Sequence, residues 1–284
     1  MNNRVQDAYA KCEALAHSHY ENFPVAKMVP KPLRKHVAAV YAFARTADDI
    51  ADEDHDTIAA DDPARVQKLE KFEAQLDLPP AERDENWRWI FDACDATIEQ
   101  FKIPKQLFRD LVSAFKQDVV KKRYANFPEL LDYCRRSANP VGRLVLLLHG
   151  FRDARRFAQS DSICTALQLA NFWQDMSVDR GKNRIYIPQS DWNGLSDADF
   201  LAPSASEEVR EIVKFQVERT AQMFDAGAPL PDTLPFPLSL EIRATIAGGR
   251  TILRKIAAQG FDTLSSRPRI TKLDKIKILL KSLL

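Results

Sequence analysis

The chain has 284 residues, enough for one large domain or two modest ones, and its hydrophobic fraction of 45% supports a sizeable core. Lysine and arginine (41) nearly balance aspartate and glutamate (40), so no excess of charge favours nucleic acid as a partner. The four cysteines lack CxxC spacing and no segment resembles a signal peptide or a membrane span, so a cytoplasmic protein without zinc or disulfides is expected.

Helical periodicity runs through nearly the whole chain, and only 8 glycines interrupt it. The sequence therefore predicts an all-α protein, arranged as one domain over residues 1–284. The breaks between helices are rich in proline, aspartate and glycine, and none is long enough to be an interdomain linker. The expected helices cover residues 4–18, 31–53, 64–76, 84–101, 104–122, 127–150, 153–180, 206–226, 237–260 and 270–283.

The second expected helix ends in an acidic run, RTADDIADED (Arg45–Asp54), directly after the apolar VAAVYAFA. Asp48 and Asp52 are four residues apart, as are Asp49 and Glu53, so each pair lies on one side of the helix. Like charges one turn apart destabilise a helix. A lone DxxxD pattern is usually a solvated helix face, and a pair of carboxylates that binds a cation is the alternative.

A second acidic stretch lies in LANFWQDMSVDRGKNRIYIP, residues 169–188. Asn171, Asp175 and Asp179 fall at i, i+4 and i+8 of an otherwise apolar helix, with Gln168 and Gln174 alongside. Magnesium takes oxygen ligands, usually one or two carboxylates together with waters and substrate phosphates. If the two acidic faces meet across a central cavity, Mg²⁺ would relieve their repulsion and hold a diphosphate.

Three segments together resemble the squalene/phytoene synthase family: YAFARTADDIADE (Tyr41–Glu53), RYANFPELLDYCRRSANPVG (Arg123–Gly142) and NFWQDMSVDRGKNRIYIP (Asn171–Pro188). The resemblance extends over residues 15–280. It implies the all-α isoprenoid (terpenoid) synthase fold, built around a central cavity. It also implies an enzyme that ionises a prenyl diphosphate with Mg²⁺ as cofactor.

The resemblance also implies roles for individual residues. The metal ligands would be Asp48, Asp52, Asn171, Asp175 and Asp179, and the catalytic set would be the four aspartates with Tyr41. The substrate would contact Arg45, Gln168, Asn171, Gln174, Arg184 and Tyr186, with Asp49 and Phe172 as secondary candidates. Apart from the resemblance, Arg267 and Lys272 lie just before the final expected helix, and two interpretations apply: they close over a diphosphate, or they are ordinary surface charge. Aromatic faces stabilise cations, and Tyr41, Phe43, Phe172 and Trp173 are candidates for such a pocket or for ordinary core. Arg45 would bind diphosphate or pair with Asp48 or Asp49.

The chain departs from the common family pattern at several positions. Glu21, in HYENFPVA, stands where many members have a lysine that binds diphosphate, so one diphosphate subsite is in doubt. Gln174 and Val178 replace an arginine and a glutamate, and AGGRTILRKI (Ala247–Ile256) lacks a tyrosine. HYENFP, FWQD and GGRTIL are instead similar to the hydroxysqualene synthase branch of bacterial hopanoid biosynthesis.

This resemblance implies ionisation of presqualene diphosphate, rearrangement of the cation and capture by water to give hydroxysqualene. Gln174, Tyr186 and Asn171 are all candidates to position the water. Two alternatives stay open: a head-to-head condensing enzyme that makes presqualene diphosphate, squalene or phytoene, and a catalytically silent helical binding or assembly factor.

The final stretch, ITKLDKIKILLKSLL, has helical periodicity, with Ile270, Leu273, Ile276, Leu280 and Leu283 or Leu284 on one face. Two interpretations apply: a core helix that buries this face, or a helix that lies on an anionic membrane surface. The expected partners are accordingly a prenyl diphosphate, the inner face of a membrane by peripheral contact, and neighbouring pathway enzymes.

Overall fold

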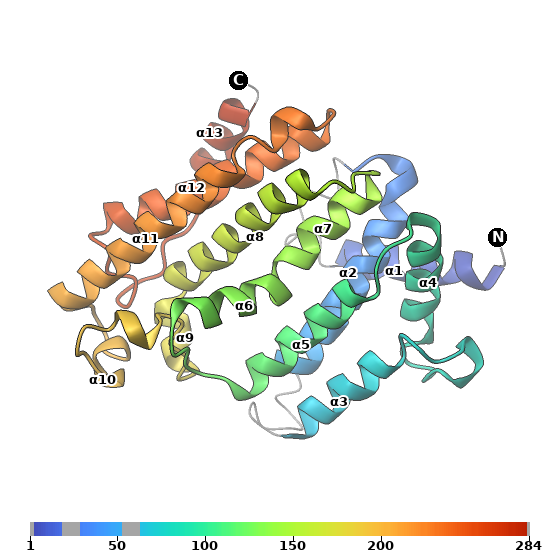
Figure 1. The fold of residues 1–284 in the computed structure, drawn as a ribbon, viewed down its shortest axis with the longest axis horizontal. Coiled ribbons are helices and arrows are strands. Elements are labelled where there is room, and N and C mark those ends of the chain that lie inside the picture. Colours follow the sequence, from blue (N-terminus) through green and yellow to red (C-terminus); the bar gives the residue numbers. More distant parts are fainter. Residues whose placement is uncertain (1–2, 19–28, 53–62, 283–284) are drawn as a thin grey trace. The chain divides into compact units, whose positions relative to one another are not determined.

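The protein is described by a computed structural model that covers residues 3–18, 29–52 and 63–282 (Figure 1). These residues form helices and turns, with no strand among them, so the all-α prediction is confirmed. The chain divides into two compact units, one of Met1–Val120 with Pro140–Asp153 and the other of Lys121–Asn139 with Ala154–Leu284. That both units belong to one domain stays a prediction.

The first unit is organised around α2. Its helices are α1 (Asn3–Ser18), α2 (Lys31–Asp52), α3 (Pro63–Ala74), α4 (Arg88–Phe101), α5 (Gln106–Val120) and most of α7 (Asn139–Leu148). α2 packs against α1, α3, α4 and α5. The Phe43 ring of α2 is fully buried, with its centroid 5.0 Å from those of Phe72 and Phe108 and 5.7 Å from that of Phe91. This aromatic core fixes α2, which carries the first acidic motif.

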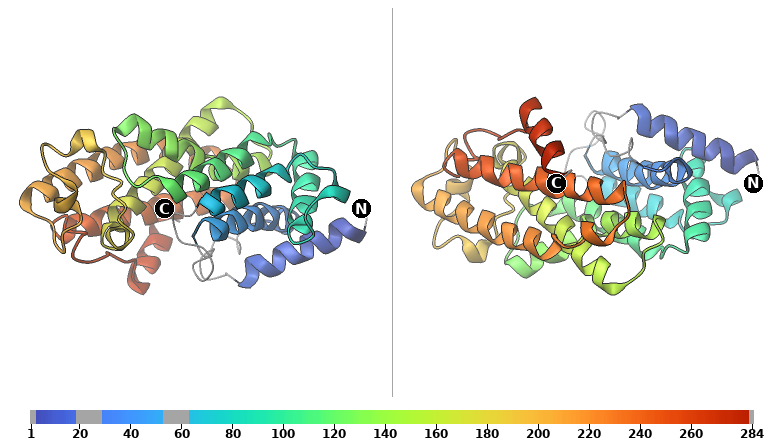
Figure 2. Two further views of the ribbon diagram at one scale, coloured as in Figure 1. Left: turned by 90° about the horizontal axis from the view of Figure 1, so that it is seen from below. Right: turned by 90° about the horizontal axis from the view of Figure 1, so that it is seen from above.

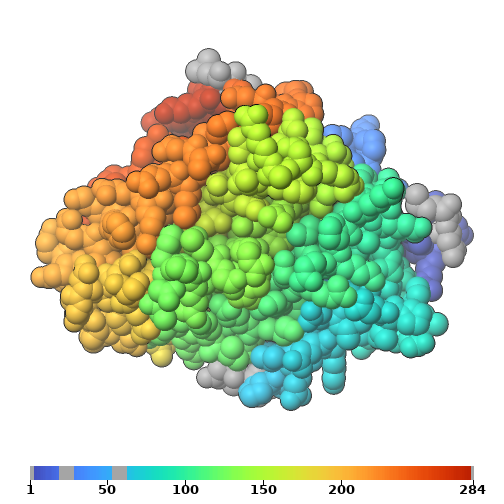
Figure 3. Space-filling model, viewed as in Figure 1, coloured from blue at the N-terminus to red at the C-terminus, as the bar shows by residue number. Residues whose placement is uncertain are grey.

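The second unit is built on three long helices that run alongside one another: α8 (Ala154–Gln174), α11 (Glu207–Gly227) and α12 (Leu238–Ala258) (Figure 2). Shorter elements complete it: α6 (Phe127–Ser137), α9 (Met176–Gly181), α10 (Asp197–Phe200) and α13 (Lys272–Ser282). In the space-filling view, α11 and the segment before it form part of the visible surface of this unit, in orange and yellow (Figure 3). Trp173 of α8 is fully buried and donates its indole N–H to Thr220 Oγ1 of α11 (2.8 Å).

Two long expected helices are each divided in the structure. The helix expected over 127–150 becomes α6 and α7, because Pro140 lacks the N–H that a helix interior requires and is accommodated in the first turn of α7. The helix expected over 153–180 becomes α8 and α9, with Asp175 between them. The short α10 had no counterpart in the sequence prediction.

Candidate functional site

The first acidic motif occupies the last turns of α2. The Arg45 guanidinium lies 2.6 Å from Asp49 Oδ1 and 3.4 Å from Asp48 Oδ2. Tyr41, one turn earlier, is half-buried, and its pKa is raised chiefly by burial and opposed by the Arg45 charge. The ion pairs that the sequence suggested for Arg45 are therefore present, and they hold Arg45 against two carboxylates one turn after Tyr41.

Arg65 secures the end of α2 beside this motif. Its side chain is fully buried, and Nη1 donates a hydrogen bond to the carbonyl oxygen of Ala51 (2.6 Å). The last carbonyls of a helix have no partner within the helix, and a cation there also interacts favourably with the helix dipole. The neighbouring Asp52 is half-buried as the final residue of α2. Sequence reasoning did not single out Arg65, because its burial depends on tertiary packing.

The second acidic motif lies at the break between α8 and α9. Asp175 has φ −100° and ψ 10°, outside the helical values of its neighbours. Its backbone N–H still donates to the backbone carbonyl oxygen of Asn171 (2.9 Å), and the backbone N–H of Asp179 donates to the backbone carbonyl oxygen of Asp175 (2.8 Å). The predicted four-residue stacking of Asn171, Asp175 and Asp179 therefore continues through the break. The Ser177 N–H instead donates to the carbonyl oxygen of Thr263 (3.0 Å).

The segment that follows α12 binds directly to this motif. The Arg267 guanidinium forms a two-pronged ion pair with Asp175, with Nε on Oδ1 and Nη2 3.0 Å from Oδ2. The buried Gln174 side chain donates Nε2 to the carbonyl oxygen of Pro268 (2.7 Å). Together with the Thr263 contact, these bonds attach residues 263–268 to the break. The structure thus brings Arg267 together with Gln174 and with Asp175, which lies 92 residues earlier in the sequence.

The environment of Asp179 disfavours its negative charge. Burial is the main cause, the nearby Asp175 carboxylate adds to it, and together they raise the pKa of Asp179 to about 7, although the charges of Arg184, Lys182 and Arg267 oppose the shift. When Asp175 and Asp179 are both ionised, their negative charges repel each other, and a bound cation would remove this repulsion. The pair is therefore suited to a bound cation.

An aromatic stack borders the same motif. The rings of Phe172 and Tyr186 are stacked with centroids 3.7 Å apart and planes inclined by 10°. Tyr186 also stacks with Tyr124 at 5.7 Å, and Phe172 contacts Tyr133 at 5.8 Å. Tyr124 and Tyr133 lie in a segment that resembles the family, but sequence reasoning assigned them no role. Of the expected aromatic candidates, Phe172 belongs to this stack, and the fully buried Trp173 contacts it with ring centroids 6.4 Å apart. Phe43 is fully buried in the core of the first unit.

Four predicted site residues of the second unit line one small cavity of about 10 Å³: Phe172, Asp179, Arg184 and Tyr186. This volume accommodates about one water molecule. Gln168 is half-buried on α8 and Asn171 is exposed, and neither lines this cavity. Glu21 and Glu53 lie outside the described residues.

The donor chemistry of both motifs fits Mg²⁺. Each offers carboxylate oxygens, the donors that a hard divalent cation prefers. In the described ranges no three His, Cys, Asp or Glu side chains converge closely enough to bind a metal by themselves. Each motif therefore supplies a pair at most, as in magnesium sites that complete their coordination with water and substrate phosphate. At the second motif, the raised pKa of Asp179 is the observation that supports a cation.

The squalene/phytoene synthase family matches residues 15–274 of the chain. A hydroxysqualene synthase of Rhodopseudomonas palustris is 33% identical over 259 residues, covering 89% of this chain and 85% of the relative. One from Sinorhizobium fredii is 32% identical with the same coverage. A chloroplastic phytoene synthase of Solanum lycopersicum is 28% identical over 96% of this chain and 88% of its own length.

Solved structures show the same fold. The crystal structure of squalene synthase HpnC from Alicyclobacillus acidocaldarius is 36% identical, has a TM-score of 0.82 and covers 92% of this chain and 97% of its own. A dehydrosqualene synthase also has a TM-score of 0.82, at 20% identity, and covers 99% of this chain and 97% of its own. Among the described residues, no helix has the length and apolar character needed to cross a bilayer.

Proposed function

Because the chain belongs to the squalene/phytoene synthase family and is therefore an isoprenoid synthase, we propose that it converts presqualene diphosphate to hydroxysqualene with Mg²⁺ as cofactor. The branch assignment rests on the two hydroxysqualene synthases at 33% and 32% identity. The metal assignment rests on the half-buried Asp179, whose pKa is raised to about 7 beside Asp175, in a motif whose donors are carboxylate oxygens.

In the proposed reaction, the carbon–oxygen bond to the diphosphate breaks and its electron pair leaves with the diphosphate. Asp48, Asp52, Asp175 and Asp179 would hold Mg²⁺, with Asn171 assisting; when bound, the ion offsets the charge of the departing group. Arg45 and Arg184 supply positive charge beside these motifs. The cyclopropylcarbinyl cation rearranges, water adds to it, and a proton is released.

The side chains of the second unit suit the later steps of this reaction. Phe172 and Tyr186 present aromatic surface, which stabilises a cation without attacking it. Tyr186 also carries a hydroxyl group and, like Asp179, lines the cavity that accommodates about one water. Since Gln174 is buried with its amide on Pro268, and Asn171 is exposed, we favour Tyr186 to position the water.

Incubation of the purified protein with Mg²⁺ and presqualene diphosphate, without reductant, tests the proposal by mass analysis of the extracted lipid. Hydroxysqualene as the product would support it. Turnover of farnesyl diphosphate alone to presqualene diphosphate would instead identify a condensing enzyme, which the 28% identical phytoene synthase keeps as the second candidate.

The doubtful diphosphate subsite has its own test. An enzyme that accepts one diphosphate rather than two does not need the lysine that Glu21 replaces. Glu21→Lys should therefore change either the choice between farnesyl and presqualene diphosphate or the turnover number. An unchanged variant would contradict this role for Glu21.

Contact with the inner face of a membrane and with neighbouring pathway enzymes is likewise proposed. Substrate and product of this reaction both carry long hydrocarbon chains, which partition into lipid.

A further inference from the structure

The outer face of α13 presents a row of large apolar side chains to solvent. Leu273, Ile276 and Leu280 are 69%, 56% and 59% exposed, and their i, i+3, i+7 spacing places them on one side of the helix. Leu279, at 52%, borders them. Elsewhere in the described chain, large exposed apolar residues occur singly on α5, α7, α9, α11 and before α12. Single exposures are normal, whereas a cluster marks an interaction surface.

The opposite side of α13 packs on α12. Asp274, Ile278 and Ser282 follow at i, i+4 and i+8; Ser282 is buried, and Asp274 pairs with Lys255 of α12 at 2.9 Å. The apolar row therefore faces away from α12. The interpretation of this helix as one that buries its apolar face in the core is thus wrong for the described residues.

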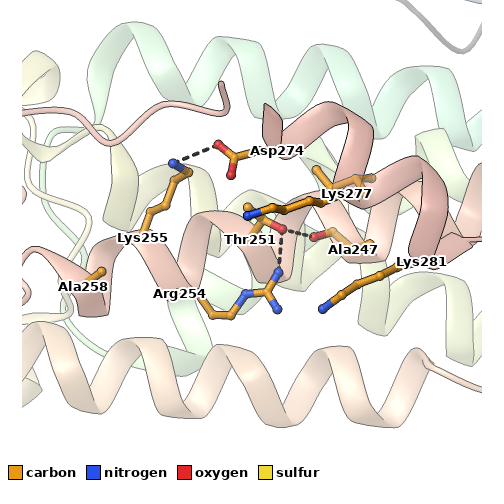
Figure 4. Close-up of a pocket in the computed structure, with 9 residues that line it drawn as sticks. Ala247, Thr251, Arg254, Lys255, Ala258, Asp274, Lys277 and Lys281 are labelled. Carbon is orange, nitrogen blue, oxygen red and sulfur yellow. Dashed lines mark hydrogen bonds and ion pairs between the residues drawn. The ribbon is translucent and has the colours of Figure 1, made fainter. Parts of the chain in front are cut away.

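A basic groove of about 370 Å³ runs beside this row, between α12 and α13. Lys277 and Lys281 extend from α13 over Thr251 and Arg254 of α12 (Figure 4). Since Lys277 and Lys281 follow Leu273 at i+4 and i+8, they lie along the edge of the apolar row. Lys272, which is exposed and lies four residues before Ile276, is at the other edge. The apolar row is thus bordered by lysines on both sides.

The groove carries an excess of positive charge. Asp274 is its one lining carboxylate, and the ammonium of Lys255 together with hydrogen bonds from Thr271 holds the pKa of Asp274 well below its ordinary value. Asp274 therefore stays ionised and neutralises Lys255. No carboxylate of the described ranges pairs with Arg254, Lys277 or Lys281.

We propose that α13 and the groove form a docking surface for an anionic phospholipid bilayer, in which Leu273, Ile276 and Leu280 enter the acyl region while Lys277, Lys281 and Arg254 contact the headgroup phosphates. An interfacial helix of this kind lies in the plane of the membrane, with its apolar side in the lipid and its lysines at the headgroups. The charge of the groove favours anionic lipid over a second copy of this chain. The surface is independent of the proposed reaction, so either can fail alone.

Co-sedimentation of the full chain with vesicles tests the apolar row. We expect binding to equimolar phosphatidylcholine–phosphatidylglycerol vesicles and weak binding to phosphatidylcholine alone. The triple variant Leu273→Gln, Ile276→Gln, Leu280→Gln should lower the partition constant by roughly tenfold or more for each side chain. A matched control, Val120→Gln with Val141→Gln, removes two exposed apolar side chains from other helices and should bind as the wild type does.

The lysines need a separate variant, because their attraction to anionic headgroups is screened by salt, whereas the insertion of apolar side chains into the bilayer is not. Lys277→Gln with Lys281→Gln should weaken binding to the anionic vesicles by about fivefold for each lysine, and high salt should remove most of that difference. Lys11→Gln with Lys71→Gln is the control at exposed lysines on α1 and α3. All four positions are exposed, so circular dichroism should show unchanged folding.

Two outcomes would overturn the proposal. One is equal binding of the wild type, the triple variant and the lysine pair to anionic vesicles. The other is self-association of the wild type without lipid that the triple variant abolishes, with no vesicle binding; this would make the row an interface between copies of the chain.

Discussion

Asp179 combines burial with a neighbouring carboxylate, and both act on its proton affinity. Its pKa is raised from 3.8 to about 7 in the folded protein. The folded state therefore holds this proton more tightly than the unfolded state. The stabilisation that results is fully present below pH 4 or so and is lost as the pH rises through about 7. Ionisation of Asp179 in the metal-free protein thus opposes folding.

Asp179→Asn should accordingly stabilise the metal-free protein at alkaline pH while it abolishes turnover. The gain over the wild type should grow between about pH 4 and pH 7 and then level off, with an upper limit of about 4 kcal/mol. Urea unfolding in the presence of a chelator, across this pH range, measures it. Asp7→Asn, at an exposed position of α1, is the control. If the free energy of unfolding changed with pH in the same way for Asp179→Asn and the wild type, the burial of this charge would be contradicted.

Arg267 forms an ion pair with Asp175, one of the proposed metal ligands. The pair is partly exposed, at 39% for Arg267 and 27% for Asp175, so its contribution to stability is about 1 kcal/mol or less. Arg267→Gln should lower the melting temperature of the metal-free protein slightly. It should also increase the gain in melting temperature on adding Mg²⁺, because Asp175 no longer has to exchange one cation for another.

A thermal melt with and without Mg²⁺ measures this difference directly. Arg269→Gln is the matched control, since Arg269 is an exposed arginine two residues further along. An Mg²⁺-dependent gain that is equal in Arg267→Gln and the wild type would mean that Arg267 does not compete with the metal.

At the scale of elements, two adjacent glycines of α12 have opposite surroundings. A Cβ at Gly249 would lie 2.3 Å from Phe224 Cζ of α11 and 3.0 Å from Leu167 Cδ2 of α8. A Cβ at Gly248 would meet no atom within 4 Å. The close packing of α12 on α8 and α11 therefore depends on Gly249, and Gly248 has no such role.

Gly249→Ala should destabilise the protein by about 1–3 kcal/mol, because the buried Phe224 ring has to move. Gly248→Ala should stabilise it by about 0.5–1 kcal/mol, because alanine is favoured over glycine within a helix. Equilibrium unfolding of the two variants gives the comparison. If both substitutions shifted stability in the same direction, α12 would not pack as closely as the structure shows.

The spacing of the acidic residues could be predicted from sequence because it depends on local geometry. Asn171, Asp175 and Asp179 keep their four-residue hydrogen-bond register even across the break. The break itself could not be predicted, since the N–H of Ser177 donates to Thr263, far along the chain. The Arg65 bond to Ala51 depends on tertiary packing in the same way, because no periodicity specifies which arginine becomes buried.

The apolar row of α13 is a second case in which the sequence could not predict a tertiary contact. Periodicity located its face but did not decide between core and surface. The structure decides it through Asp274 and Ser282, polar residues that pack on α12 while the leucines remain exposed. Hydrophobic periodicity identifies which residues share a face, and the neighbouring elements determine what that face contacts.

At the scale of the whole molecule, the two acidic motifs belong to different compact units, and the family match at residues 15–274 includes both. Asp48 and Asp52 end α2 of the first unit, whereas Asp175 and Asp179 lie at the α8–α9 break of the second. The proposed reaction requires both pairs to act on one diphosphate. This requirement has a kinetic consequence, because residues that act as a unit are not additive when they are removed.

Asp48→Asn and Asp175→Asn should each reduce turnover of presqualene diphosphate by about 100-fold or more, since each removes charge that stabilises the same leaving group. The turnover of the double variant should then be only slightly below that of the less active single variant. The initial rate of diphosphate release measures the turnover of all three variants. Asp7→Asn combined with Asp175→Asn is the control and should match Asp175→Asn alone. If the two losses multiply instead, the motifs act in separate steps, and the assignment of both pairs to one diphosphate is wrong.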